Sequence, residues 1–177
     1  MSGATGSGIP AGGLLFRMRV WVALGFGSGL APKAPGTFGT LAAVFVFLPF
    51  APLAAGHPLL YGATVAGLIA VAVWTSEAAE SHFRRHDVGS IVIDEFAGFF
   101  TTMFLVPTNV RTLALAFVLF RFFDIVKVPP ARQIDRGWPG GWGVVMDDVV
   151  SGVYACAVMQ IAMRVAPAAL GLTAPGG

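Results

Sequence analysis

Long apolar runs separated by short polar or glycine-rich stretches dominate the pattern of the chain. Runs of this kind predict helices that cross a membrane or lie within it, although a 17-residue segment spans only about 25 Å, the low end for a crossing. The third and fourth segments can instead form a partly embedded helical hairpin that turns at Pro107-Thr108-Asn109. The five apolar segments are residues 38–54, 58–76, 91–107, 110–126 and 144–165.

The pattern therefore predicts an all-α fold, a polytopic membrane-embedded bundle of about five apolar helices. Residues 14–26 mix apolar side chains with Arg17 and Arg19, which predicts a short N-terminal interfacial helix. Residues 25–40 contain five glycines and two prolines, so no regular element is expected there. Thr37 or Thr40 is a candidate cap for the next helix.

The length predicts one domain. With 177 residues the chain fits a single helical membrane domain at residues 14–166. The glycine-rich stretch 1–13 is expected to be disordered, and residues 167–177 are expected to form a flexible tail.

Composition strengthens the membrane prediction and narrows the partners. The chain is 56% hydrophobic and 11% charged, with a mean hydropathy of +0.78, whereas soluble domains are about 25% charged. The formal net charge is only +2, so the sequence offers no basic patch and predicts no nucleic-acid partner.

The basic residues orient the segments. If the first apolar segment leaves the cytoplasm, two basic residues, Arg111 and Arg164, lie outside and Arg121 lies within a segment. The positive-inside rule favours this orientation, which also places every acid on the cytoplasmic side. The eight basic residues on that side are Arg17, Arg19, Lys33, Arg84, Arg85, Lys127, Arg132 and Arg136.

Five acids stand at the ends of three separate apolar segments: Asp94 and Glu95 open the third, Asp124 closes the fourth, and Asp147 and Asp148 open the fifth. Ionised carboxylates in apolar segments are costly unless they are paired or bind metal. Their oxygens suit Mg²⁺, which is usually held by a few carboxylates, water and substrate phosphate. Favourable contacts with helix N-termini, or pairing with Arg121 or Arg132, are the alternative. Adjacent helical residues point about 100° apart, so Asp147 and Asp148 need not share one role.

Two further groups bear on phosphate binding. Arg121, Asp124 and Lys127 follow an i, i+3, i+6 spacing, which fits either a self-neutralising ladder or a metal ligand between two phosphate-binding cations. The glycine-rich loop with Lys33 can offer backbone N–H groups to an anion, but the P-loop spacing is missing and an ordinary membrane-surface loop is the favoured interpretation.

Three stretches together carry a family resemblance: GFGSGLAPKAPGTFGTLAA, DVGSIVIDEFAGFF and FRFFDIVKVPPARQIDRGWPGGWGVVMDDVVSGV. In this order, over roughly residues 25–155, they resemble the phosphatidylglycerophosphatase A family. The resemblance implies a Mg²⁺-dependent membrane phosphatase. Such an enzyme removes the terminal phosphate of phosphatidylglycerophosphate, an anionic phospholipid, to give phosphatidylglycerol and inorganic phosphate. It implies action on the cytoplasmic face of the bacterial inner membrane.

The hypothesis assigns roles to the candidate residues. Mg²⁺ is held by some of the five acids, and a water attacks phosphorus, with a covalent aspartyl-phosphate as the rival route. The phosphate-binding candidates are Arg121, Lys127, Arg132, Lys33, Gly36 and Thr37. The alternative function is a small cation or proton-coupled transporter that uses the intramembrane acids. The apolar outer halves of the segments argue for a one-sided site instead.

Overall fold

The computed structural model describes residues 13–85 and 88–172, and the regular elements in this part of the chain are all helical, with no strand. The predicted all-α fold is thus confirmed, while residues 1–12 and 173–177 of the predicted disordered ends lie outside the described part. The helices and 3₁₀ turns (η) are α1 (Leu14–Ala23), η1 (Gly25–Leu30), α2 (Pro35–Phe47), η2 (Leu48–Phe50), α3 (Ala51–Gly56), α4 (Pro58–Phe83), α5 (Ile93–Thr102), α6 (Val110–Val126), α7 (Ala131–Gly137), α8 (Gly140–Val165) and η3 (Ala168–Leu170).

Three helical stretches among the described residues are long and apolar enough, by length and composition, to cross a membrane. They are Pro35–Gly56, Pro58–Phe83 and Gly140–Val165, with 22, 26 and 26 residues. The predicted count of about five crossing helices is not confirmed. α5 has only ten residues, about 15 Å of helix, which is too short to cross a hydrocarbon core of about 30 Å.

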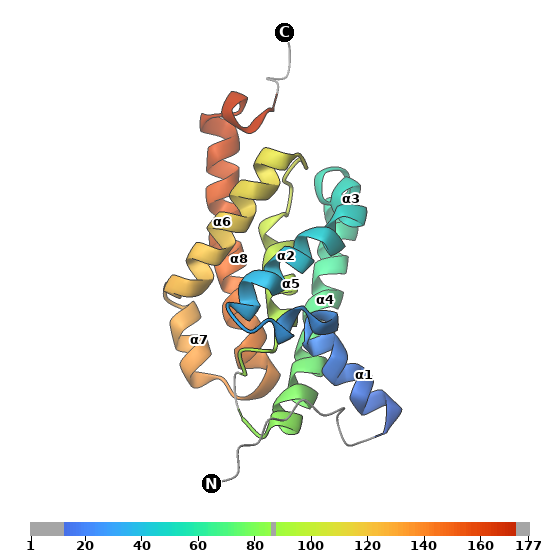
Figure 1. Cartoon of the computed structure of the whole chain (residues 1–177). Helices are drawn as coiled ribbons and strands as arrows, with labels where there is room; N and C mark the ends of the chain where they lie inside the picture. The colour runs from blue at the N-terminus through green and yellow to red at the C-terminus, as the bar shows by residue number, and fades with distance from the viewer. Residues whose placement is uncertain (1–12, 86–87, 173–177) are drawn as a thin grey trace.

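α5 lies at the centre of the bundle, among α2, α4, α6 and α8 (Figure 1). Nine of its ten residues are buried. Its contact with α8 depends on two glycines: a Cβ at Gly98 would lie 2.8 Å from the carbonyl oxygen of Asp148, and one at Gly152 would lie 2.3 Å from the carbonyl oxygen of Gly98. This close crossing brings the acidic start of α5 next to the acidic pair of α8.

The glycine-rich loop is shorter than predicted, because α2 already begins at Pro35. Proline fits the first turn of a helix, where its missing N–H has no partner to lose. The residue before the helix is Ala34, and no side chain caps it, so the prediction that Thr37 or Thr40 caps this helix was wrong. The Thr40 hydroxyl lies instead within hydrogen-bond distance of the Gly36 carbonyl on its own helix.

Three short elements were not predicted. The first is η1, which forms in the stretch 25–40 where no regular element was expected, so that expectation was wrong for Gly25–Leu30. α7 is a seven-residue polar helix that follows the end of α6, where Lys127 adopts a left-handed φ of 48°. At the other end, the first residues of the predicted tail form η3. The side chain of Asn109, which also caps α6, donates a hydrogen bond to the carbonyl of Leu170 in η3 at 2.9 Å.

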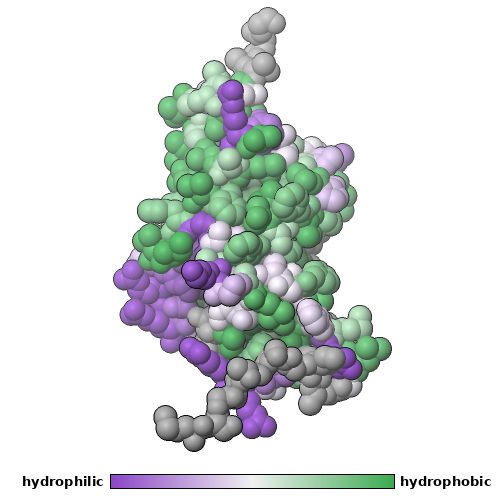
Figure 2. Space-filling model, in the orientation of Figure 1, coloured by the Kyte–Doolittle hydropathy of each residue, from purple (hydrophilic) through white to green (hydrophobic). Residues whose placement is uncertain are grey.

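The face of the molecule in Figure 2 has a large hydrophilic region toward one end. Hydrophobic residues cover most of the face in Figure 2, and hydrophilic residues gather toward one end, over the region where Figure 1 places α7. The C-terminal end of α4 and the start of α8 lie at this same end (Figure 1).

Candidate active site

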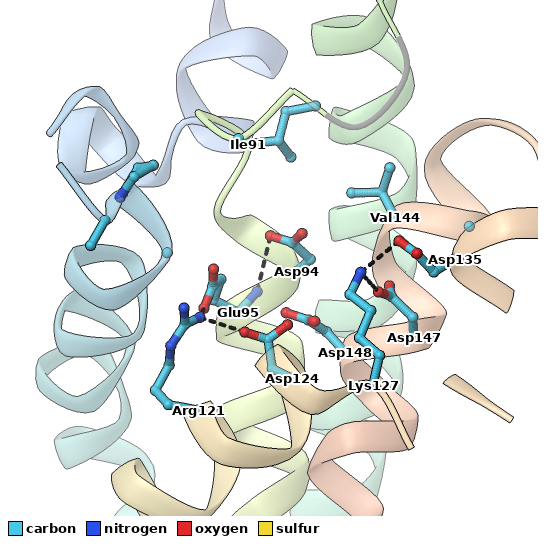
Figure 3. Close-up of a pocket in the computed structure, with 15 residues that line it drawn as sticks. Ile91, Asp94, Glu95, Arg121, Asp124, Lys127, Asp135, Val144, Asp147 and Asp148 are labelled. Atoms are coloured by element: carbon cyan, nitrogen blue, oxygen red, sulfur yellow. Dashed lines mark hydrogen bonds and ion pairs between the residues drawn. The ribbon is translucent and has the colours of Figure 1, made fainter. Parts of the chain in front are cut away.

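The five predicted acids lie in one cavity of about 250 Å³ (Figure 3). The first turn of α5 supplies two of them, the last turn of α6 supplies one, and the N-terminal part of α8 supplies two. The first residues of α2 close another side of the cavity. The sequence predicts that acids from three segments meet at one membrane surface, and the structure brings them together.

The cavity has a buried floor and a more open rim. Asp94, Glu95, Asp147 and Asp148 keep 9%, 7%, 3% and 3% of their surface exposed. The other charged side chains that line the cavity are partly exposed and form its rim: Arg121, Asp124, Lys127 and Asp135. An incoming group therefore meets the cations before it reaches the deepest carboxylates.

Asp94, Glu95 and Asp148 form the tightest acidic group. Each offers one carboxylate oxygen, and these oxygens lie within 4.8 Å of one another. Six acids and two basic residues line the cavity, a formal excess of four negative charges if all are ionised. In addition, the buried Oδ1 of Asp147 has no hydrogen-bond partner among the described residues. An all-oxygen donor set with uncompensated charge fits a hard divalent cation such as Mg²⁺.

Glu95 is held on one side only. Its Oε2 accepts hydrogen bonds from Thr40 Oγ1 at 2.6 Å and from Arg121 Nη1 at 2.5 Å. Its Oε1 faces Gly36, where a Cβ would lie only 2.1 Å away. The arrangement fixes the carboxylate through Oε2 and leaves Oε1 as the oxygen available to a ligand.

The two cations are held by carboxylates but keep free donors. Arg121 pairs with Glu95 and, at 2.7 Å, with Asp124 Oδ2, while its buried Nε has no hydrogen-bond partner among the described residues. The Lys127 ammonium contacts Asp135 Oδ1 at 2.5 Å and Asp147 Oδ2 at 2.6 Å, which uses two of its three donors.

The electrostatic surroundings keep Lys127 charged. Burial lowers the pKa of Lys127, but the Asp147 carboxylate and the hydrogen bonds to Asp135 and Asp147 raise it further, so its net pKa lies above its ordinary value. A permanently charged ammonium at the rim suits the recognition of an anion.

The adjacent aspartates of α8 contact different partners, as the geometry of a helix predicts. Asp148 faces Asp94 and Glu95, whereas Asp147 faces Lys127 (Figure 3).

The structure brings only part of the predicted phosphate-binding set to the cavity. Arg121, Lys127 and Gly36 line it. Lys33 and Thr37 are exposed and do not line it. Arg132 is exposed as well, and its Nη2 donates to the carbonyl of Val126 at 3.2 Å. Neither Lys33 nor Arg132 forms an ion pair with an acid among the described residues.

Two residues of the cavity region were missed. Asp135 lies on the unpredicted helix α7, and its pairing with Lys127 depends on the bend between α6 and α7, which no sequence spacing indicates. Thr40 lies one helical turn after Gly36, so the two residues share one face of α2. This spacing can be recognised only when the helix is known to start at Pro35.

The chain is similar to a group of known proteins. The sequence model of the family described as Phosphatidylglycerophosphatase A matches residues 21–163. Phosphatidylglycerophosphatase A of Escherichia coli strain K12 is 39% identical over 144 residues, which are 78% of this chain and 79% of that protein. The protein of the same name from Haemophilus influenzae is 37% identical over 139 residues, 78% of this chain and 84% of that protein.

A third relative carries a different name. A protein of Bacteroides thetaiotaomicron is 37% identical over 152 residues, 82% of this chain and 93% of that protein, and its name carries a provisional phosphatidylinositol-3-phosphatase assignment. No solved structure matches the chain.

Proposed function

The chain belongs to the phosphatidylglycerophosphatase A family and is a phosphatase, and from this premise we propose that it hydrolyses the terminal phosphate of phosphatidylglycerophosphate to give phosphatidylglycerol and inorganic phosphate. The observation that carries the proposal is the cavity in which buried carboxylates from α5 and α8 lie beneath Arg121 and Lys127. Membership of a phosphatase family favours hydrolysis over the cation-transport alternative.

The size and place of the cavity support a lipid head group as the substrate. Its volume of about 250 Å³ is below the range of about 300–1,000 Å³ that is typical of sites for drug-sized ligands. A phosphorylated head group can enter such a cavity while the acyl chains stay in the bilayer. We place the cavity on the cytoplasmic face of the bacterial inner membrane, since the count of basic residues favours that orientation.

In this proposal Asp94, Glu95 and Asp148 hold a Mg²⁺ ion. Mg²⁺, when bound, supplies Lewis-acid polarisation of phosphoryl oxygens and lowers the pKa of bound water. The free Nε–H of Arg121 and the remaining ammonium donor of Lys127 bind phosphate oxygens. Arg121 therefore keeps its carboxylate contacts while it orients the substrate.

A water attacks phosphorus, the bond between phosphorus and the glycerol oxygen breaks, and the departing oxygen takes a proton from solvent to become the hydroxyl of phosphatidylglycerol. We assign proton acceptance from the water to Asp147, because its Oδ1 is buried and has no hydrogen-bond partner among the described residues. Lys127 holds the other oxygen of the same carboxylate, which keeps it pointed into the cavity. The positioned carboxylate acts as a general base, a contribution of typically about 10²–10⁴-fold.

Direct attack by water and a covalent aspartyl-phosphate route can be distinguished by where ¹⁸O from labelled water first appears. In a single turnover in ¹⁸O-water, direct attack puts label straight into the released phosphate. Label that appears first in an enzyme carboxylate would establish the covalent route and remove the role given to Asp147.

Phosphate release from the purified full chain in detergent micelles tests the proposal. The substrates are phosphatidylglycerophosphate, phosphatidate, lysophosphatidate and phosphatidylinositol 3-phosphate, each with Mg²⁺ and after chelation. We expect phosphatidylglycerophosphate to be the best substrate, with activity lost on chelation and restored by Mg²⁺. Faster phosphate release from phosphatidylinositol 3-phosphate would overturn the proposed substrate assignment. Phosphate release that survives chelation would overturn the proposed role of Mg²⁺.

A further inference from the structure

A second hollow, which the catalytic proposal does not use, lies at the polar end of the bundle. It is a cleft of about 590 Å³ between the end of α4 and the corner that joins α7 to α8, and we call it the basic cleft. Its lining residues are Glu80, Arg84, Arg85, Arg136, Gly137, Trp138, Pro139 and Gly140.

The basic cleft gathers three guanidinium groups that have no ion pair among the described residues. Arg84, Arg85 and Arg136 are exposed, and none of them forms an ion pair or a side-chain hydrogen bond within the described ranges 13–85 and 88–172. Glu80 is the single acid among the lining residues that the structure describes, and these residues carry a formal excess of two positive charges. Guanidinium groups bind phosphate oxygens with paired hydrogen bonds, which gives the cleft a phosphate-binding chemistry.

Glycines at the start of α8 allow its backbone to lie close to α4. Gly140 has a φ of +66°, which a residue with a side chain rarely adopts. One residue later, a Cβ at Gly141 would lie 2.4 Å from the carbonyl oxygen of Val73. α4 and α8 are therefore in close contact at Val73, about three turns before Arg84 at the end of α4. Arg136 lies on α7, which leads into the start of α8.

The position of the cleft identifies the source of the phosphate. α4 and α8 are two of the three stretches long and apolar enough to cross a membrane, and the cleft lies where α4 ends and α8 begins. Trp138 lines it, and both Trp138 and Trp142 are exposed. Tryptophan concentrates at the membrane–water interface, the depth at which lipid head groups lie. The cleft therefore lies at the depth of the lipid head groups, where a lipid phosphate can reach it.

We propose that the basic cleft binds the head-group phosphate of an anionic phospholipid at a site separate from the catalytic cavity. Asp135 lines the cavity while Arg136, the next residue, lines the cleft, and adjacent helical residues point about 100° apart, so the two sites adjoin different sides of α7. The lipid held there anchors the α7–α8 corner to the membrane surface. The proposal concerns binding alone and does not depend on the hydrolytic reaction.

Native mass spectrometry of the full chain in detergent, titrated with phosphatidylglycerol, tests this site. Each basic residue near an anionic membrane surface contributes enough for about a fivefold change in binding. We expect Arg136→Gln to lower the affinity for one bound phosphatidylglycerol about fivefold. The double variant Arg84→Gln/Arg85→Gln should lower the same affinity about 25-fold. Arg164→Gln, an exposed arginine at the opposite end of α8, is the matched control and should bind as the unchanged protein does.

Three further arms separate the alternatives. Phosphatidylcholine with the same acyl chains should not occupy the site, and millimolar inorganic phosphate should not displace the lipid. The variant Arg121→Gln/Lys127→Gln, whose cavity lacks both cations, should keep its phosphatidylglycerol. The proposal is overturned if the cleft variants bind phosphatidylglycerol like the unchanged protein, if Arg164→Gln weakens binding equally, or if binding disappears only in the cavity variant. Equal binding of phosphatidylcholine or displacement by phosphate would overturn it as well.

Discussion

Replacing Gly36 with alanine is a sharp test of how the cavity is held. An ideal Cβ at this position would lie 2.1 Å from Glu95 Oε1 and 2.9 Å from Arg121 Nη1. Non-bonded heavy atoms prefer separations of about 3.5 Å, so the Glu95 carboxylate has to move by roughly 1 Å or more. It cannot simply swing away, because Thr40 and Arg121 hold its other oxygen.

A displacement of about 1 Å in a catalytic group can lower the rate by about 10²-fold. We therefore expect kcat/KM for phosphate release to fall about 100-fold, which corresponds to about 2.7 kcal/mol in the barrier. The backbone should tolerate the change, since Gly36 lies in the first turn of α2 and alanine favours a helix by about 1 kcal/mol over glycine. Thermal unfolding in detergent should consequently show no loss of stability.

The control is Gly67→Ala on α4, where an added Cβ meets no atom within 4 Å. It makes the same chemical change in a helix but leaves Glu95 in place, so it should keep both activity and stability. If Gly36→Ala releases phosphate as fast as the unchanged protein, the contact between α2 and Glu95 has no part in catalysis. If its activity falls only together with its melting temperature, the loss is one of folding and the reasoning fails in the same way.

Two other substitutions test separate contacts. Thr40→Val removes the buried hydroxyl that donates to Glu95 and should lower kcat/KM about tenfold in steady-state kinetics. Thr40→Ser keeps this donor and should retain most activity. Equal losses in the two variants would show that the hydrogen bond has no part in catalysis. Asn109→Ala removes the side chain that accepts hydrogen bonds from Arg111 N and Thr112 N at the start of α6, and should destabilise the protein by about 1 kcal/mol. A lower melting temperature with unchanged KM is the expected result, and an unchanged melting temperature would contradict the capping argument.

The long helices and the meeting of the acids could be predicted because both follow from the distribution of apolar and charged residues over long stretches of the sequence. Apolar runs mark α4, α6 and α8 directly, and the count of basic residues predicts that Asp94, Asp124 and Asp148 share one side of the membrane. The split between Asp147 and Asp148 follows from the 100° step of a helix. These features need no knowledge of how one helix packs against another.

The contacts that complete the cavity depend on exact helix ends, and these the sequence does not determine. The glycine and proline density of residues 25–40 indicates a loop, but a proline in the first turn starts a helix as readily as it ends one. α2 therefore begins before the predicted place, and Thr40 points to Glu95 instead of capping the helix. Likewise, α7 is too short and polar to leave an apolar pattern, so its Asp135 could not be placed beside Lys127.

The central claim is that the buried acids of this cavity perform the hydrolysis, and Asp148→Asn tests it most directly. The substitution keeps the size of the side chain while it removes one carboxylate from the group formed with Asp94 and Glu95. The measurement is Mg²⁺-dependent phosphate release from phosphatidylglycerophosphate, with Glu77→Gln, an exposed acid outside the cavity lining, as the control. We expect Asp148→Asn to lose at least about 10²-fold in kcat/KM and Glu77→Gln to retain its rate. Unchanged Mg²⁺-dependent release by Asp148→Asn would contradict the assignment of the active site.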